Sequence, residues 1–488
     1  MKSIVRATAM LSGSSVVTIL VGLVSAKTLA LLLHPDGYGY YGLIQSVVAV
    51  ASLATGMGIA TGMVRHGAGS ACLKDEIAVS VLRNGAWALF GVLGGISLLI
   101  LTLFRGPLSR LGGLNQPIIM PIVGVIILFT VANNIQTGML NTYHLVSVLA
   151  TYAILNSVVC ASITVSAILI GHSRGIVVAV LSGAIASWAI SGTMLRRHVG
   201  RPVTNFFRWE TLHAAWSLLQ FGGTFTLSTL VGTGVQLALP IVVFHLLSTE
   251  SVGYYKAASA IALGYLGFIV TAMGQDYFPR VSAAKDDPGA LIQLINEQHR
   301  LVMLLAVPVI LGTLALVPYL IPLVYSHKFM PAVEILEWQL IGDLFKFSSW
   351  TMSFAILARC KTSVYFLTES IGGITTLVTT WVGVRLFGLP GLGIASLVMF
   401  IIYYAVTWIV IRREVRLTWT SANKKMMIAA VCAATIIRIL PSTPFAKLRT
   451  PIAVALAIGA SLLSMRVLWH QYREGKTSQQ AAKVAIVG

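Results

Sequence analysis

Two lysines inside apolar stretches are the side chains of this sequence with the clearest capacity to bind a ligand. Lys27 lies in the first apolar stretch, seven residues before His34, and Lys256 lies one turn into an apolar stretch of the second half. A charge at membrane depth costs about 2.5 kcal/mol or more, so such residues usually have a partner or line a cavity. We expect both ammonium groups to face one cavity and hold a phosphate-bearing ligand. Alternatively, Lys27 snorkels to the lipid headgroups along its apolar stem.

Acidic residues in the apolar stretches are candidates for carrying protons or sodium ions. Asp343 and Lys346 are three residues apart on one helix face, so they form either a structural pair or part of a proton relay. Glu369 lies deeper in the next stretch, with Arg359 and Lys361 near the inner end of that stretch. It either titrates because burial isolates it, or is satisfied by those two cations. Apart from such proton or sodium coupling, no cofactor and no metal site is expected.

Amide side chains interrupt several apolar stretches. They are Gln45, Asn133, Asn134 and Gln236. Such amides commonly join membrane helices by hydrogen bonds, but a path for a sugar would need the same donors and acceptors. Both interpretations stay open from the sequence. Arg438 stands near the end of an apolar stretch, where we expect it to snorkel to the headgroups.

The composition is that of an integral membrane protein. Of 488 residues, 57% are hydrophobic and only 10% are charged, which is too few to cover a soluble protein of this length. Apolar runs of about 20 residues recur along the chain, and each can cross a bilayer as a helix. The net charge of +19 is spread over short connections, so nucleic acid is not an expected partner. The four cysteines form no CxxC pair, and no disulfide framework is implied.

The apolar runs predict an all-α polytopic membrane protein with about 14 transmembrane helices. Two lobes of six helices each form a parallel pseudo-repeat, and two further helices follow them. The predicted divisions are the N-terminal lobe at 1–195, a cytoplasmic amphipathic linker at 196–218, the C-terminal lobe at 219–411, the two additional helices at 412–470 and a cytoplasmic tail at 471–488. The predicted spans are 10–33, 40–63, 86–104, 118–140, 145–170, 176–195, 219–247, 253–274, 301–325, 338–357, 364–386, 392–411, 426–440 and 451–469.

The basic residues predict the orientation of the chain. Most of the 34 lysines and arginines fall in the tails and in the connections on the same side as the N-terminus. By the positive-inside rule, that side is cytoplasmic, and an even number of spans places the C-terminus there too. Six spans in each half also mean that both halves enter the membrane in the same direction, as parallel repeats do.

A short turn after the first apolar stretch has an echo in the second half. Gly-Tyr-Tyr at 39–41 aligns with Gly-Tyr-Tyr at 253–255, and Asp36 aligns with Glu250. Both turns follow a long apolar helix candidate and open another. The repeated turn supports the prediction of two related halves.

Enzyme motifs are absent from the sequence. It holds no HExxH, no nucleophile elbow and no Walker-type GxxxxGK[ST]. The predicted outer loops are short and offer few acidic residues for catalysis. We therefore expect a transporter and not an enzyme.

One segment carries a family pattern. Lys27 is followed by an apolar run, by Leu-His-Pro-Asp-Gly-Tyr-Gly-Tyr-Tyr at 33–41, and by a second span with glycines at 56, 58 and 62 that ends in Arg65. This pattern resembles the polysaccharide flippases of the multidrug/oligosaccharidyl-lipid/polysaccharide exporter superfamily. Their usual form is an Arg, then Leu-Gly-Pro-Glu-x-[Tyr/Phe]-Gly. Here Lys27 stands where the Arg is common, and His34 replaces a Gly.

The resemblance implies a V-shaped bundle of two lobes around a central cationic cavity. It implies that undecaprenyl-diphosphate carrying an oligosaccharide, a repeat unit of O-antigen, exopolysaccharide or capsule, moves from the cytoplasmic to the outer leaflet of a bacterial inner membrane by alternating access. Lys27 would contact the diphosphate, with Lys256 and Arg65 as further cavity cations. The bilayer and other polysaccharide assembly proteins would be the partners.

Three other functions stay open at this stage. A polysaccharide polymerase or ligase would act on the same lipid-linked units, but it would need a large catalytic outer loop. A non-transporting scaffold of a glycan assembly complex would have no use for Lys27 in the membrane. A drug exporter of the same superfamily would be expected to place an acidic residue in the first two spans, and these contain none.

Overall fold

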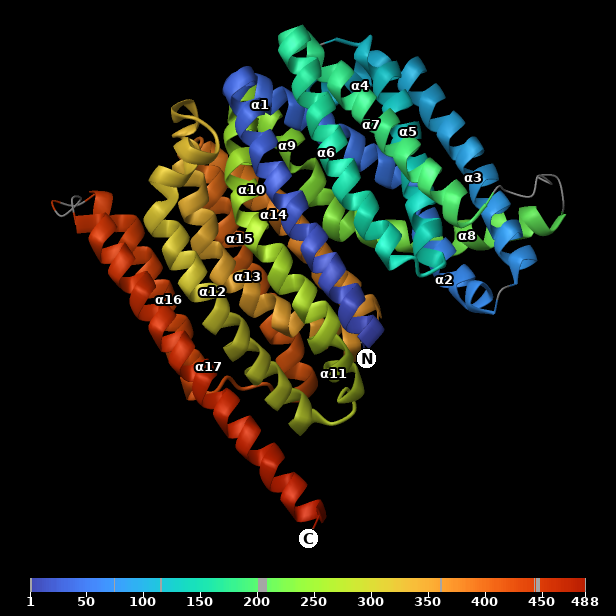
Figure 1. Cartoon of the computed structure of the whole chain (residues 1–488). Helices are drawn as coiled ribbons and strands as arrows, with labels where there is room; N and C mark the ends of the chain where they lie inside the picture. Colours follow the sequence, from blue (N-terminus) through green and yellow to red (C-terminus); the bar gives the residue numbers. More distant parts are fainter. Residues whose placement is uncertain are drawn as a thin grey trace. The chain divides into compact units, whose positions relative to one another are not determined.

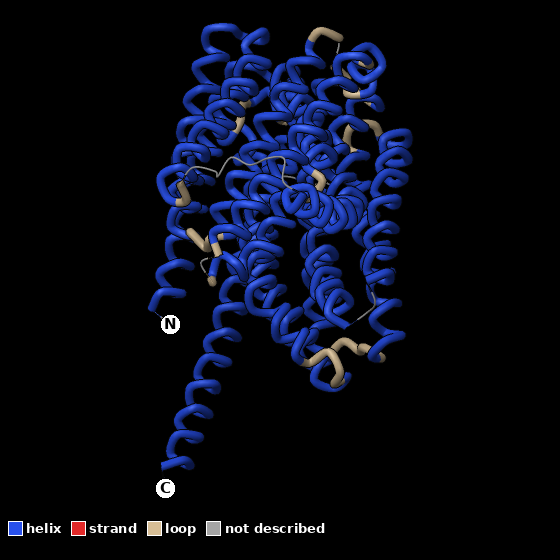
Figure 2. The backbone as a smooth tube through the Cα atoms, turned by 90° about the vertical axis from the view of Figure 1, so that its right-hand side faces the viewer, coloured by secondary structure: helices blue, strands red, loops and turns tan. Residues whose placement is uncertain are grey.

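The computed structural model describes residues 2–487 except 74, 115, 201–208, 360–361, 443 and 445–447. Within these residues, helices are joined by short turns and no strand occurs (Figure 2). Backbone contacts divide the chain into two compact units. The first comprises Met1–Ala257 and Pro322–Phe329, and the second comprises Ala258–Ile321 and Met330–Gly488. The prediction of an all-α polytopic protein is confirmed. The lobe boundaries stay a prediction, and part of the predicted linker lies outside the described residues.

The first unit is a bundle in which α6 packs against α7 and α1, α5 packs against α7, and α3 packs against α8 (Figure 1). Two of its elements, α10 and α12, cross into the second unit. The helices of this unit are α1 (Lys2–Gly56), α2 (Ile59–Cys72), α3 (Glu76–Leu103), α4 (Arg105–Leu111), α5 (Ile119–Thr142), α6 (Val146–Gly171), η1 (His172–Arg174), α7 (Gly175–His198), α8 (Trp209–Thr229), η2 (Leu230–Gly234), α9 (Val235–Leu246), the start of α10 (Thr249–Ala272), the end of α12 (Pro288–Val324) and η4 (His327–Phe329).

The second unit is built around α13, which packs against α15, while α14 covers the other side of α15. Helices α16 and α17 contact each other, and α17 runs on through most of the residues predicted to form the tail (Figure 1). Besides the remainders of α10 and α12, its helices are η3 (Met273–Tyr277), α11 (Phe278–Ala283), α13 (Ala332–Arg359), α14 (Thr362–Phe387), α15 (Gly391–Val415), α16 (Ser421–Ile439), η5 (Leu440–Ser442) and α17 (Arg449–Val487).

The helices suit a lipid environment because the backbone polar groups of a helix are satisfied within its own segment. Eight stretches of the described residues are long and apolar enough to cross a membrane. Two of these, Gly13–Gly56 and Val146–His198, have 44 and 53 residues, which is enough for two spans each. Every predicted span coincides with helical structure, except at one break in the second span.

Two breaks interrupt the helices of the first two spans. Helix α1 is non-helical at His34, which has φ 57° and ψ −178°, and Pro35 follows. The chain reverses direction there, so the first two predicted spans form a hairpin (Figure 1). The second break separates α1 from α2 at Met57 and Gly58, whose φ angles are 40° and 62°. The sequence predicted the first break but treated the second span as continuous.

Candidate functional site

The two similar turns found in the sequence are in direct contact in the first unit. A Cβ atom on Gly39 would lie 1.9 Å from the carbonyl oxygen of Thr249, and one on Gly253 would lie 2.2 Å from that of Pro35. In the alignment, Pro35 corresponds to Thr249 and Gly39 to Gly253. Each turn therefore places its glycine against the equivalent carbonyl of the other, a reciprocal contact that only residues without a Cβ permit. We call this contact the paired turns.

Aromatic side chains pack beside the paired turns. The Tyr38 ring lies edge-on to Tyr325 and Phe329, with ring centroids 5.7 and 5.6 Å apart. Tyr254, from the second turn, also meets Phe329 edge-on at 6.2 Å. Edge-to-face pairs of this kind stabilise contacts beyond the area that they bury. Tyr325, just after α12, and Phe329, at the end of η4, thus pack with the two turns as one layer.

Lys27 lies near this layer and is only half-buried. Its Nζ donates a hydrogen bond to the carbonyl oxygen of Pro322 at 2.9 Å. An ammonium group carries three donors, so one carbonyl leaves donors for a ligand. The hydrogen bond to Pro322 also explains how the first span tolerates the charge of Lys27. With this partner, the Lys27 side chain does not need to reach the lipid headgroups.

Lys256 lies against the other arm of the α1 hairpin. A Cβ on Gly42 would be 3.0 Å from its Cγ and 3.2 Å from its Cε, so glycine makes room for the lysine stem. Within the described residues, no hydrogen bond or ion pair of the Lys256 ammonium is found. Gly42 lies eight residues after His34, and Lys27 lies seven residues before His34. At a helical rise of 1.5 Å, both lysines therefore lie roughly 10 Å from the turn at His34.

Arg65 lies elsewhere in the first unit. It is exposed on α2, and its guanidinium stacks on the ring of Phe221 with 4.3 Å to the centroid. Close by, a Cβ on Gly222 would lie 2.0 Å from the carbonyl oxygen of Met57. The contacts found for Arg65 in the described residues hold α2 against α8, and none brings it to the two lysines.

The predicted amides are not gathered in one place. Asn133 is half-buried, and its Oδ1 accepts a hydrogen bond from the Tyr152 hydroxyl at 2.8 Å, as a helix-joining amide would. Gln45, Asn134 and Gln236 are exposed, and no hydrogen bond of their side chains is found in the described residues. Gln136, an amide of the same stretch as Asn133 and Asn134, is buried and accepts a hydrogen bond from Ser191, as a helix-joining amide would.

The acidic candidates of the second unit differ from each other. Asp343 is buried and pairs with Lys346 at 3.6 Å, which fits a structural pair. The Lys346 ammonium also lies over the ring of Trp350, 5.1 Å from its centroid. Glu369 accepts a hydrogen bond from Tyr403 at 2.6 Å and a longer one from Ser353 at 3.5 Å. Proton or sodium coupling through these residues stays a prediction.

The partners expected for Glu369 are not the ones found. Arg359 donates instead to the carbonyl oxygen of Lys285, and Lys361 lies outside the described residues. Helix α15 supplies Tyr403, 34 residues away from Glu369 in the sequence. Such a pair leaves no local pattern, so sequence reasoning could not find it.

Arg438 corrects a further prediction, because it does not snorkel. Its Nη2 lies 2.6 Å from Glu334 Oε1 and its Nε lies 3.1 Å from Glu337 Oε2. Arg449 also pairs with Glu337, so α13, α16 and α17 share one ionic network in the second unit. Trp338 covers the Arg438 guanidinium at 5.0 Å from the ring centroid. Glu334 and Glu337 stand three residues apart in the sequence. Their arginine partners lie more than 100 residues further along the chain, so the sequence did not reveal the pairing.

Known proteins match this chain over much of its length. The model of a family described as polysaccharide biosynthesis protein matches residues 28–334. The lipid III flippase of Escherichia coli is 22% identical over 418 residues, which cover 83% of this chain and 97% of that flippase. A Shigella flexneri protein named as an O-antigen transporter is 26% identical over 179 residues, which cover 36% of this chain and 42% of that protein.

Solved structures share the fold at lower identity. The lipid II flippase MurJ in an inward closed conformation has a TM-score of 0.73 and 14% identity, and the match covers 95% of this chain and 99% of MurJ. A MATE crystal structure has a TM-score of 0.57 and 14% identity, with 86% and 97% covered. The helices described above are therefore arranged as in these transporters.

Proposed function

Because the chain belongs to the polysaccharide biosynthesis protein family, we propose that it is a flippase for undecaprenyl-diphosphate-linked oligosaccharide. The substrate is a repeat unit of a surface polysaccharide, carried from the cytoplasmic to the outer leaflet of a bacterial inner membrane. The names of the relatives, a lipid III flippase and an O-antigen transporter, support this substrate class.

The observation that carries the proposal is the Lys256 ammonium, for which no hydrogen bond or ion pair is found among the described residues, and its place against Gly42 on the second arm of the α1 hairpin. No salt bridge in the described residues involves either lysine. A diphosphate is an anion that the ammonium groups of two lysines can hold together. Lysine binds phosphate as a point charge and does not need the fixed geometry of an arginine. We assign Lys256 the larger share of this binding, because Lys27 already donates to Pro322.

The oligosaccharide requires donors and acceptors along its path. We assign this role to the exposed amides Gln45, Asn134 and Gln236. The paired turns lie at the end of the first unit that we predict to face outward. Release of the substrate on that side would require Gly39 and Gly253 to separate, as alternating access demands.

The proposal is tested by flipping of a labelled undecaprenyl-diphosphate oligosaccharide in proteoliposomes that contain purified variants. Lys256→Ala and Lys27→Ala should each slow transport, the first by at least tenfold. Lys27→Arg should keep most of the activity, since the charge stays. Lys328→Ala is the matched control: this exposed lysine lies 3.4 Å from His34 and should leave transport within about twofold.

The outcome that contradicts the assignment is equally specific. Unchanged transport in Lys27→Ala and Lys256→Ala would place the diphosphate elsewhere and make both lysines structural. Equal losses in Lys328→Ala and Lys256→Ala would show a general charge effect instead of a binding site.

A further inference from the structure

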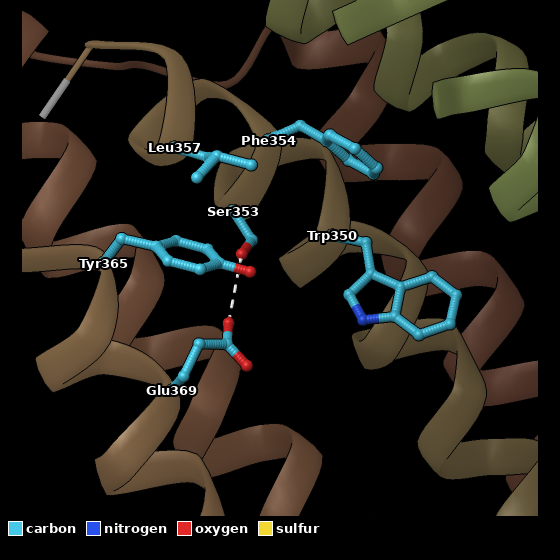
Figure 3. A pocket seen from close by; sticks show the side chains of 6 residues that line it. All are labelled: Trp350, Ser353, Phe354, Leu357, Tyr365 and Glu369. Atoms are coloured by element: carbon cyan, nitrogen blue, oxygen red, sulfur yellow. Dashed lines mark hydrogen bonds between the residues drawn. The ribbon is translucent and has the colours of Figure 1, made fainter. Parts of the chain in front are cut away.

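A small cavity lies within the second unit, between α13 and α14. It has a volume of about 170 Å³, and it is lined by Trp350, Ser353, Phe354, Leu357, Tyr365 and Glu369. Figure 3 shows the Glu369 carboxylate hydrogen-bonded to Ser353, with Tyr365 and Trp350 to either side. The volume is several times the roughly 30 Å³ that a water molecule occupies in the liquid, so a small ligand fits. Leu357 is 40% exposed, and the cavity therefore reaches the surface of the unit.

The carboxylate in this cavity is held in place by hydrogen bonds, without a cationic partner among the described residues. Tyr403 and Ser353 both donate to its Oε1, which fixes the group. In the part of the chain that the structure describes, no lysine, arginine or histidine forms an ion pair with Glu369. The second carboxylate oxygen is thus left for a ligand, and a partly buried carboxylate is stabilised by a cation.

Three of the other lining residues are aromatic. Trp350, Phe354 and Tyr365 line the cavity, and the Lys346 ammonium lies over the ring of Trp350, 5.1 Å from its centroid. A carboxylate beside aromatic rings is the arrangement that recognises organic ammonium groups. We propose that this cavity is a binding site for a small organic ammonium cation, with Glu369 as its counter-ion. The site lies in the second unit, whereas both lysines belong to the first, and the proposal does not depend on the proposed transport.

A metal ion suits the cavity less well. Sodium and similar hard cations need several oxygen ligands, whereas the lining offers one carboxylate and two hydroxyls among apolar groups. Among the described residues, no cluster of three His, Cys, Asp or Glu side chains could hold a metal ion. The ammonium can come from a free amine or from the headgroup of phosphatidylethanolamine, and the same carboxylate would recognise both.

The test measures the thermal unfolding midpoint of the purified full chain against tetramethylammonium and ethanolamine. Sodium and potassium chloride at equal ionic strength are the reference salts. The wild type should show a saturable rise with the ammonium ions, as expected for a ligand that binds only the folded state. Glu369→Gln should weaken the apparent affinity at least tenfold, and Trp350→Leu should weaken it severalfold. Glu414→Gln, an exposed carboxylate on α15, is the matched control and should behave as the wild type.

Several results would overturn the site. They are a wild type without a saturable response, an equal response to sodium, or an unchanged affinity in Glu369→Gln. If Glu369→Gln does not fold, the comparison of ammonium with sodium on the wild type decides alone.

Native mass spectrometry then distinguishes the two sources of the ammonium group, a free amine and a phosphatidylethanolamine headgroup. Selective retention of phosphatidylethanolamine over phosphatidylglycerol, lost in Glu369→Gln, identifies a headgroup site. Binding of soluble amines without such retention identifies a free amine, and either result supports the ammonium site.

Discussion

At the scale of single residues, His34 adopts a backbone conformation that few residues other than glycine adopt. Its φ of 57° with ψ near 180° costs about 1–3 kcal/mol for a residue with a Cβ. Polysaccharide flippases that share the motif commonly have glycine here. The side chain compensates little, because its only hydrogen-bond contact found in the described residues is to the exposed Lys328 at 3.4 Å.

We predict that His34→Gly stabilises the protein by about 1 kcal/mol, since relief of the strain exceeds the entropy that glycine adds to the unfolded chain. The measurement is the thermal unfolding midpoint in detergent. His34→Ala is the control, because it removes the imidazole but keeps the Cβ. Equal midpoints for the glycine and alanine variants would show that the turn is not strained.

At the scale of elements, the paired turns hold two backbone segments of the first unit in close contact. A methyl group at Gly253 would overlap the Pro35 carbonyl, and a backbone carbonyl cannot move aside as a flexible side chain can. The contact therefore fixes how α1 and α10 approach each other. Gly264, on the same helix α10, is the natural comparison, because a methyl group added there would meet no atom within 4 Å.

Gly253→Ala should destabilise the chain by about 3 kcal/mol or prevent its purification, by the cost of overpacking a rigid contact. Gly264→Ala should be neutral or slightly stabilising, because alanine favours an exposed helix. Both are measured as yield after size-exclusion chromatography and as thermal midpoint. A Gly253→Ala variant as stable as Gly264→Ala would mean that the two turns do not touch in the folded protein.

The ionic network of α13, α16 and α17 gives a second prediction at this scale. Glu337 is 4% exposed and pairs with two arginines, whereas Glu334 is 47% exposed. Removing the charge of a buried partner leaves its cations uncompensated, at a cost of about 3 kcal/mol, and an exposed pair contributes about 1 kcal/mol or less. Glu337→Gln should therefore lower the thermal midpoint more than Glu334→Gln. A larger loss in Glu334→Gln than in Glu337→Gln would indicate that the lipid headgroups, and not Glu337, compensate the charges of Arg438 and Arg449.

Sequence reasoning found the elements more readily than their contacts. Apolar runs locate the spans because each must cover the bilayer thickness, and the repeated Gly-Tyr-Tyr located both paired turns. The break at Met57 was missed because glycines such as Gly56 and Gly58 are common within membrane helices that stay continuous. The partners of Glu369 and Arg438 were missed because they lie on other helices, where no local sequence pattern connects them. Lys27 lies seven residues before His34, and Lys256 lies against Gly42, eight residues after it, but their shared cavity and their binding of a diphosphate stay predictions.

At the scale of the whole molecule, the distribution of basic residues predicts that both termini are cytoplasmic. A fluorescent protein fused to the C-terminus should therefore be bright, and a phosphatase active only in the periplasm should be inactive at the same place. Moving the fusion to the turn after His34 should reverse both signals. An active phosphatase at the C-terminus would contradict the orientation and, with it, the direction of transport.

The proposed function depends on movement of a lipid-linked glycan across a bilayer. The most direct measurement is the rate at which the purified wild type exposes labelled undecaprenyl-diphosphate oligosaccharide on the far leaflet of proteoliposomes. Protein-free vesicles and vesicles that contain Lys256→Ala serve as references. We predict rapid exposure by the wild type, at least tenfold faster than by either reference, with the glycan unchanged in length. The flippase function would be contradicted if a folded protein, tested with its cognate glycan, exposed the substrate no faster than protein-free vesicles do. That result would favour a scaffold, whereas lengthened glycans would favour a polymerase.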